Sequence, residues 1–251
     1  MVDLSGKTVV VSGASSGIGK ACAKEAAKLG AKLILLGRDE KRLQDSLNQL
    51  GEKEHHSIAH DITDYKGLQE KLKAFLDASN SKVNGFVHAA GIDYIMPFAL
   101  TKTQVFRDMY EVNVLAGLEL IKVLSKKKYM PDNGVSYLFI SSVMGIVGNH
   151  GLSSYCASKS AISSLIKSLA LEYANKKVRV NAINPGSVET PMLQRSFEKM
   201  TATEVESIIA AHPLGLGKPE DISALACFLL SDRSRWISGS NIVIDGGYSA
   251  R

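Results

Sequence analysis

The chain is poor in cysteine. Its three cysteines, Cys22, Cys156 and Cys227, are widely spaced, odd in number and contain no Cys-x-x-Cys pair. A disulfide framework or a structural zinc site normally shows paired cysteines at short, regular spacing. We therefore expect neither a disulfide nor a bound metal.

Long hydrophobic runs are also lacking. Apolar stretches such as Leu33 to Leu36 are far shorter than the roughly 20 residues that cross a bilayer. The first residues, which include Asp3 and Lys7, do not form the apolar core of a signal peptide. We expect a cytoplasmic protein with no membrane partner.

Charge of one sign is only slightly in excess. The net charge is +5, and the basic residues gather locally at 126–128 and at Lys176, Lys177 and Arg179. A basic surface attracts nucleic acid, acidic carrier proteins or phosphorylated cofactors. No nucleic-acid-binding motif accompanies these clusters, so we expect no nucleic-acid partner and interpret them as solvated faces.

What the chain does have is a regular alternation of strand-like and helix-like segments. Hydrophobic residues make up 45% of its 251 residues and charged residues 22%, as in soluble globular proteins. Alternation of this kind predicts βαβ units, a parallel sheet covered on both faces, and a single doubly wound α/β domain over residues 1–251. Expected strands are 8–12, 32–36, 56–59, 85–88, 136–141, 178–183 and 241–244, and expected helices are 18–29, 39–50, 65–78, 103–124 and 153–174. Residues 191–213 interrupt the pattern and are a candidate lid.

A glycine-rich loop joins the first strand to the first helix. It runs Ser12-Gly-Ala-Ser-Ser-Gly-Ile-Gly19. Gly13 permits a tight turn, Gly17 lets the backbone approach a pyrophosphate, and Gly19 lets the helix pack closely on the sheet. The free N–H groups at the start of the helix suit phosphate, so we expect the loop, with Ser15, Ser16 and Ile18, to bind a dinucleotide.

The end of the second strand indicates which dinucleotide. An acidic residue there holds a free ribose diol, whereas a basic residue holds a 2′-phosphate. Gly37 is followed by Arg38, whose planar guanidinium suits phosphate, so we predict NADP(H). Asp39 is a counter-indication, unless it caps the helix that begins at Glu40.

Tyr155 and Lys159 are four positions apart and therefore share one face of a helix. Reduction of a carbonyl needs a proton donor, and free tyrosine has a pKa of about 10. A nearby lysine ammonium lowers that pKa, so we expect Tyr155 to be a general acid or base. Ser142 lies at the end of a predicted strand, where its hydroxyl can hold the substrate oxygen.

The GxxxGxG spacing, together with the order glycine loop, Asn113, Ser142, Tyr155 and Lys159, resembles the short-chain dehydrogenase/reductase family over Leu4 to Tyr248. The resemblance implies a Rossmann-type fold with a seven-stranded parallel sheet, and hydride transfer at the pro-S face. It also implies that Asn113 binds a water that links Lys159 to solvent. Ser12 stands where the family usually has threonine.

The same resemblance implies further cofactor contacts. Asp61, with Ile62, matches an adenine-binding position. His88-Ala-Ala-Gly91 replaces the family's usual NNAG, with His88 more readily structural than catalytic. Remaining implied contacts, beside Tyr155 and Lys159, are Ala89, Ala90, Gly91, Pro185, Gly186, the Val188 backbone and the Thr190 hydroxyl.

These observations predict an NADP(H)-dependent oxidoreductase acting on a carbonyl or a secondary alcohol. The general likeness is to 3-oxoacyl-carrier-protein reductases, which implies an acyl-thioester substrate and allows the lysine clusters to receive an acidic carrier protein. Sugar, polyol or small-ketone reduction stays open, as does a regulatory protein that binds NADPH without turnover.

Two expectations concern the periphery of the site. Lid residues Met192, Leu193, Phe197 and Met200 line the substrate space or simply pack the lid onto the body. The family resemblance implies a homo-oligomer, tetramer or dimer, built on the last strand and the long helices. The stretch from His212 to Glu220 lacks an arginine that is usual in the family, which leaves any tetramer contact of that arginine in doubt.

Overall fold

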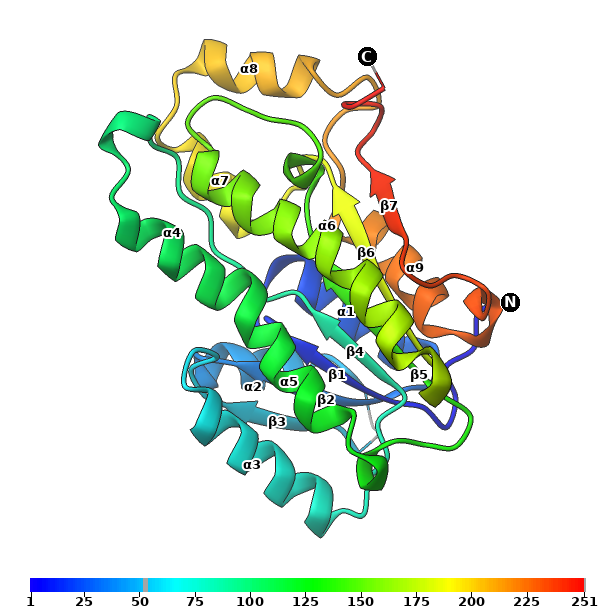
Figure 1. Ribbon diagram of the computed structural model, residues 1–251. Coiled ribbons are helices and arrows are strands. Elements are labelled where there is room, and N and C mark those ends of the chain that lie inside the picture. The colour runs from blue at the N-terminus through cyan, green and yellow to red at the C-terminus, as the bar shows by residue number, and fades with distance from the viewer. Residues whose placement is uncertain (52–53, 251) are drawn as a thin grey trace.

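A computed structural model describes residues 1–51 and 54–250. A parallel sheet runs through the centre in the order β3-β2-β1-β4-β5-β6-β7 (Figure 1). Its strands are β1 Thr8–Ser12, β2 Lys32–Gly37, β3 His56–Ala59, β4 Gly85–His88, β5 Val135–Ile140, β6 Val178–Pro185 and β7 Asn241–Ile244. The seven-stranded parallel sheet expected from the sequence is confirmed.

The central strands are buried on both faces because they carry almost uninterrupted apolar residues. Every residue of β5 is buried, and the four central residues of β2 are buried as well. Such runs suit a parallel sheet between two helical layers. Because all strands are parallel, their carboxyl ends meet at one edge of the sheet.

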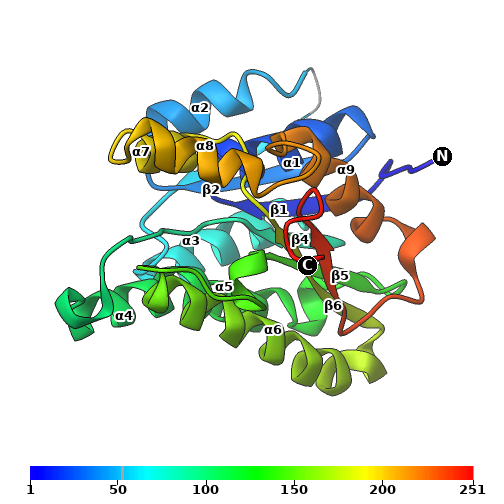
Figure 2. The same cartoon turned by 90° about the horizontal axis from the view of Figure 1, so that it is seen from above.

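Helices cover both faces of the sheet (Figure 2). One layer holds α1 Gly17–Lys28, α2 Glu40–Leu47 and α9 Pro219–Leu230, and the other holds α3 Tyr65–Ala78, α5 Ala116–Leu124 and α6 Ser153–Tyr173. The sequence analysis did not anticipate α9. Its signals were present, since Pro219 starts the helix and Glu220 and Asp221 lie in its first turn.

The helix expected over 103–124 is continuous but irregular. It consists of α4 Thr103–Tyr110, a π-helical turn η2 Glu111–Leu115, and α5. A π-turn inserts a wider loop of backbone into a helix and is frequent at functional sites. Here it centres on Asn113, whose side chain is fully buried.

The candidate lid folds into two short helices above the carboxyl ends of the strands (Figure 1). They are α7 Pro191–Phe197 and α8 Ala202–Ala210. Thr190 caps α7 by accepting from the Leu193 N–H, and Thr201 with Glu204 forms a capping box on α8. The caps explain why this polar segment becomes helical.

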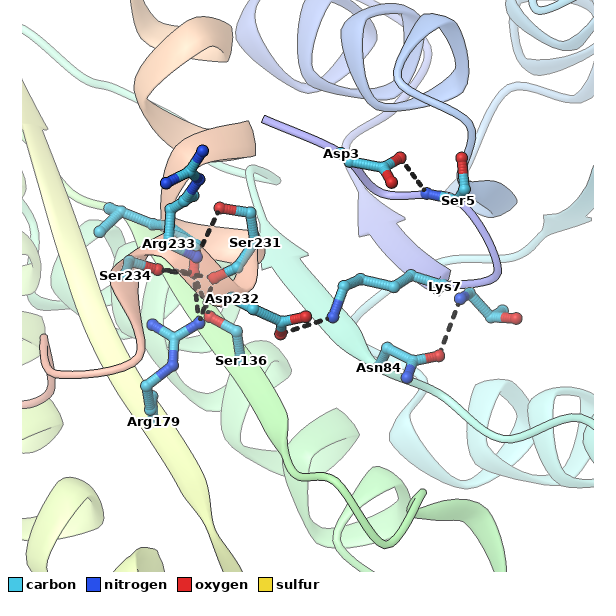
Figure 3. Close-up of polar contacts among 12 residues, drawn as sticks. Asp3, Ser5, Lys7, Asn84, Ser136, Arg179, Ser231, Asp232, Arg233 and Ser234 are labelled. Atoms are coloured by element: carbon cyan, nitrogen blue, oxygen red, sulfur yellow. Dashed lines mark hydrogen bonds and ion pairs between the residues drawn. The ribbon is translucent and has the colours of Figure 1, made fainter. Parts of the chain in front are cut away.

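Polar contacts close the opposite, amino-terminal edge of the sheet (Figure 3). The Arg179 guanidinium on β6 donates to the carbonyls of Leu229 and Ser231 at the end of α9. Lys7 pairs with Asp232 at 2.8 Å. Cations at the C-terminal end of a helix stabilise its exposed carbonyls, so Arg179 is a structural contact between β6 and α9.

Gly117 sets how closely α5 approaches the sheet, and it generates a stability prediction. A Cβ there would lie 2.7 Å from Phe139 Cε1 and 2.8 Å from His88 Cδ2, both in buried rings. We expect Gly117→Ala to lower the free energy of unfolding by about 1–3 kcal/mol, measured by urea denaturation. Gly148→Ala is the control, because a Cβ at Gly148 meets nothing within 4 Å. Equal stability of the two variants would contradict the packing argument.

Candidate active site

A cavity of about 1080 Å³ opens at the carboxyl ends of the strands. It lies where the strand order reverses between β1 and β4, the usual position of a ligand in a doubly wound sheet. The structure brings nearly all sequence-predicted site residues into its wall: Gly13, Ser15, Ser16, Gly17, Ile18, Arg38, Asp61, Ile62, Ala89, Ala90, Gly91, Ser142, Tyr155, Lys159, Pro185, Gly186, Val188 and Thr190. Gly19 and Asn113 lie behind the wall.

The glycine loop has the shape that a phosphate cradle requires. Gly13 has φ +70°, and a Cβ on it would lie 2.7 Å from the Ala90 nitrogen. A Cβ on Gly19 would lie 2.4 Å from the Gly13 oxygen. Ser16 starts α1 without a side-chain capping bond, and the first turn holds no acidic residue. The first N–H groups of α1 therefore face the cavity without a competing side chain, which fits the pyrophosphate of a dinucleotide.

Arg38 and Asp39 separate at the end of β2. Arg38 is exposed in the cavity wall. The Asp39 side chain is the N-cap of α2, because its Oδ1 accepts from the Arg42 N–H at 3.0 Å. The capping interpretation of Asp39 is confirmed, and the Arg38 side chain remains in the cavity wall at the end of β2. Lys41 and Arg42 are not part of the cavity wall.

Asp61 follows β3 at the same end of the cavity. Its Oδ1 accepts from the Thr63 N–H and hydroxyl at 2.9 and 2.7 Å. These bonds hold the pKa of Asp61 below its usual value, with smaller help from the nearby Arg38 and His60 charges. Asp61 is therefore an ionised acceptor at neutral pH.

Tyr155 and Lys159 both enter the cavity from α6, but not with the electrostatics expected from the sequence. The Lys159 Nζ donates to the Ile140 carbonyl at 2.9 Å and lies 5.6 Å from the centre of the Tyr155 ring. Burial lowers the pKa of Lys159 to about 8. Burial also raises the pKa of Tyr155 to about 12, against a lowering effect of the Ser142 hydroxyl.

The expectation that Lys159 lowers the pKa of Tyr155 is therefore wrong for this arrangement. Desolvation dominates at both residues, and it disfavours the charged form of each. The nearby Asp93 carboxylate raises the pKa of Tyr155 further. Tyr155 is a neutral phenol at neutral pH.

Asn113 is fixed immediately behind this pair. Its Oδ1 accepts from the Ile92 N–H at 2.8 Å, and its Nδ2 donates to the Ile92 carbonyl and the Ser158 hydroxyl. A Cβ on Gly91 would lie 3.3 Å from Asn113 Oδ1 and 3.7 Å from Lys159 Nζ. The π-turn thus brings an amide beside the buried ammonium, with Gly91 between them.

The strand end at Pro185 forms the remaining wall. Gly186 donates to the Ile244 carbonyl at 3.0 Å, and Val188 pairs with Gly217 in an isolated parallel bridge. The Thr190 hydroxyl accepts from the Leu193 N–H at 3.3 Å. Thr190 therefore joins the cavity wall to the start of α7.

His88 proves to be a core residue. It is buried, bonded to the Ser12 hydroxyl at 2.9 Å, and desolvation lowers its pKa to about 3. A neutral imidazole in this position ties β4 to β1, as the structural interpretation held.

The substrate half of the cavity differs partly from the expectation. Met192, Leu193 and Met200 line it, but Phe197, the last residue of α7, is not part of the cavity wall. Wall residues that sequence reasoning missed include Asp93, Ile95, Asn149, His150, Ile208, Ala211 and Tyr248. They come from three loops and α8, and no local motif marks them.

Asp93 has a particular place among these missed residues. Its Oδ2 accepts from the Ser196 hydroxyl on α7 at 3.1 Å. This contact fastens the loop after β4 to the first lid helix.

Within residues 1–51 and 54–250, no group of three or more His, Cys, Asp or Glu side chains is placed to hold a metal ion. The same part of the chain contains no helix with the length and apolar character to cross a membrane.

The buried Lys159 ammonium generates a pH prediction. The pKa of Lys159 is about 8 in the folded protein and 10.5 when the side chain is exposed. Burial of the charge therefore lowers the free energy of unfolding by its full amount below pH 8, and this loss disappears as the pH rises toward 10.5. Lys159→Met removes this charge, so we expect it to raise the free energy of unfolding at pH 7 by roughly 1–3 kcal/mol. Urea denaturation at pH 7 and pH 9.5 should show the gain shrinking at the higher pH. A variant less stable than wild type at pH 7 would refute this.

Comparison with known proteins agrees with this geometry. The sequence profile of the family described as enoyl-(acyl carrier protein) reductase matches residues 13–249. A 3-oxoacyl-(acyl-carrier-protein) reductase from Rickettsia prowazekii is 34% identical, with 98% of each chain covered. The oxidoreductase UcpA from Salmonella typhimurium is also 34% identical, over 98% of this chain and 96% of its own.

Solved structures show the same fold. A short-chain type dehydrogenase/reductase from Mycobacterium ulcerans superposes with a TM-score of 0.90 at 28% identity, covering 99% of this chain and 92% of its own. Similarity of this extent, in sequence and in structure, covers the glycine loop and the cavity together. The chain belongs to the short-chain dehydrogenase/reductase family and is an oxidoreductase that uses a nicotinamide cofactor.

Proposed function

We propose that the protein is an NADP(H)-dependent reductase that converts a carbonyl group to a secondary alcohol. The observation that supports this most is the meeting of Ser142, Tyr155 and Lys159 in one cavity with the glycine loop. A regulatory protein that only binds NADPH has no need of this group.

The cavity wall offers groups for each part of the cofactor. Ser15, Ser16 and the N–H groups of Gly17 and Ile18 would hold the pyrophosphate, and Asp61 with Ile62 would hold the adenine. Ala89, Ala90 and Gly91 would flank the riboses, where Tyr155 and Lys159 also reach. Pro185, Gly186, the Val188 backbone and Thr190 would hold the nicotinamide. When bound, the nicotinamide supplies the hydride.

The chain itself supplies the proton and orients the substrate oxygen. Ser142 Oγ accepts from the Met144 N–H at 3.1 Å, which holds the hydroxyl in the cavity wall beside Tyr155, where it would donate to the substrate oxygen. Tyr155, a neutral phenol with its pKa near 12, donates the proton that completes the alcohol. Lys159 would return a proton to Tyr155, and Asn113 would hold a water that links Lys159 to solvent. At neutral pH Tyr155 is therefore in the protonated form that reduction requires.

Replacing the proton donor tests this chemistry. We expect Tyr155→Phe to lower kcat at least about 100-fold while NADPH still binds, because the ring remains and only the hydroxyl is lost. Tyr173→Phe, near the other end of α6, is the matched control and should keep full activity. NADPH oxidation would be followed with acetoacetyl thioesters and a panel of ketones and keto-sugars. Undiminished turnover by Tyr155→Phe would contradict the proposed role.

The preference for NADP(H) rests on Arg38. It is exposed at the ribose end of the cavity, and Asp39, which would favour NAD(H), is engaged in capping α2. A guanidinium makes paired, charge-assisted hydrogen bonds with phosphate.

We expect Arg38→Ala to raise KM for NADPH roughly 10- to 100-fold and to leave KM for NADH nearly unchanged, since only NADPH carries the 2′-phosphate. Lys41→Ala removes the same charge from outside the cavity wall and serves as the control. Steady-state kinetics with both cofactors would decide. An equal change for NADPH and NADH in Arg38→Ala would overturn the preference.

We further propose a 3-oxoacyl thioester as the substrate. The lid side of the cavity is apolar at Met192, Leu193, Met200 and Ile208, which suits an acyl chain. The relative from Rickettsia, named as a reductase of such thioesters, adds support.

We do not assign the basic clusters a role in receiving a carrier protein. Residues 126–128 precede β5, and Lys176, Lys177 and Arg179 lie at the start of β6, so both clusters sit at the edge opposite the cavity. Lys128 pairs with Asp77 on α3 at 2.8 Å, and Arg179 donates to the carbonyls at the end of α9.

Self-association is part of the proposal. Leu171 on α6 is 81% exposed, Trp236 is 92% exposed, and Val243 on the edge strand β7 is 41% exposed. Exposed apolar side chains on the last strand and a long helix are what a homodimer or homotetramer would bury.

A further inference from the structure

His212 is a buried side chain that the proposed chemistry does not use. It is 4% exposed and follows the second lid helix α8. Its Nε2 lies 3.0 Å from the Ser187 nitrogen, and its Nδ1 lies 2.8 Å from the Ile208 oxygen. Because the Ser187 N–H can only donate, Nε2 accepts, so Nδ1 carries the proton and donates to Ile208.

The contacts of His212 reach three separate parts of the cavity wall. Ser187 belongs to the loop after β6, Ile208 to α8, and Tyr248 to the C-terminal segment, and all three line the cavity. The Tyr248 ring stacks on the imidazole at 4.8 Å between ring centres. His212 itself stands behind the wall that these residues form.

The loop after β6 depends on His212 at one point. Backbone hydrogen bonds hold three other groups of this loop. The Gly186 N–H donates to the Ile244 carbonyl, the Glu189 N–H donates to the Gly217 carbonyl, and the Ser187 carbonyl accepts from the Gly217 N–H. The Ser187 N–H has the imidazole as its partner. A Cβ on Gly186 would lie 3.0 Å from His212 Nε2, so the absence of a side chain at 186 allows the ring to approach.

We infer that His212 is a positioning residue that couples the lid to the nicotinamide end of the cofactor site. The inference rests on the proposed function, in which the loop from Pro185 to Thr190 holds the nicotinamide. One neutral imidazole joins that loop to α8, whose Ile208 lines the cavity, as does Ala211 directly after the helix. Closing the lid and ordering the nicotinamide loop are then a single event.

The coupling predicts an effect at one end of the cofactor only. The adenine and 2′-phosphate end, at Arg38 and Asp61, has no contact with His212. Loss of the imidazole bonds should therefore weaken NADPH but leave the fragment 2′,5′-ADP, which lacks the nicotinamide, unaffected.

Three variants separate the bonds from the stacking. His212→Phe keeps an aromatic ring for Tyr248 but loses both hydrogen bonds. His212→Gln places an amide oxygen near the Nε2 position and keeps an acceptor for Ser187. His56→Phe is the matched control, because His56 stacks on Phe75 outside the cavity wall at 3.9 Å between ring centres.

Fluorescence and calorimetric titrations would measure Kd for NADPH and for 2′,5′-ADP, and kinetics would add KM and kcat for the carbonyl substrate. In His212→Phe we expect Kd for NADPH to rise about three- to tenfold, Kd for 2′,5′-ADP to stay within twofold, and the carbonyl KM to rise. His212→Gln should recover most of the NADPH affinity, and His56→Phe should match wild type.

The outcomes distinguish the inference from the function on which it rests. If His212→Phe weakens both ligands equally, or neither, or if His212→Gln fails to restore affinity, the positioning role falls while the proposed function stands. If wild-type protein binds neither NADPH nor 2′,5′-ADP, the proposed function falls and takes the inference with it.

Discussion

The site depends on the way in which α6 is attached to the end of β5. Lys159 Nζ donates to the Ile140 carbonyl, and the Ser141 hydroxyl donates to the Lys159 carbonyl at 3.1 Å. A Cβ on Gly145 would lie 2.9 Å from the Lys159 backbone, so this glycine lets the turn after β5 lie against the helix. These contacts fix the height and rotation of α6, and therefore where Tyr155 faces Ser142.

This attachment buries the Lys159 ammonium next to the Tyr155 ring. The same desolvation that lowers the pKa of Lys159 to about 8 raises that of Tyr155 to about 12, so at pH 7 Lys159 is still an ammonium and Tyr155 is a neutral phenol. A neutral phenol is suited to give a proton to a carbonyl oxygen. The two edges of the sheet differ accordingly: at the amino edge Arg179 and Lys7 have protein partners, whereas at the carboxyl edge polar groups face an open cavity.

Local patterns in the sequence predicted what is local in the structure. Strands β1, β3, β4 and β7 have the expected bounds, since short apolar runs between turns leave little choice of register. The glycine loop and the capping by Asp39 were predictable for the same reason, because each depends on a few neighbouring residues.

What the sequence could not reveal is set by packing between distant segments. The pKa of Tyr155 follows from burial that no motif encodes, and the absence of Phe197 from the cavity wall follows from how the lid sits on the body. Asp93 and His212 gain their contacts from residues on other elements, at Ser196 and at Ser187. The lysine clusters were visible in the sequence, but the edge of the sheet on which they lie was not.

The central claim is that a hydride passes from NADPH to a carbonyl carbon in this cavity. Transfer of deuterium tests this claim most directly. Protein would be incubated with NADPH deuterated at the pro-S position of C4 and with acetoacetyl thioester, and the product alcohol would be analysed by mass spectrometry. The account predicts one deuterium on the carbinol carbon and loss of the label from the cofactor. An alcohol without deuterium, with the label retained on the oxidised cofactor, would contradict the predicted orientation, and intact NADPH across the whole carbonyl panel would contradict the proposed reaction.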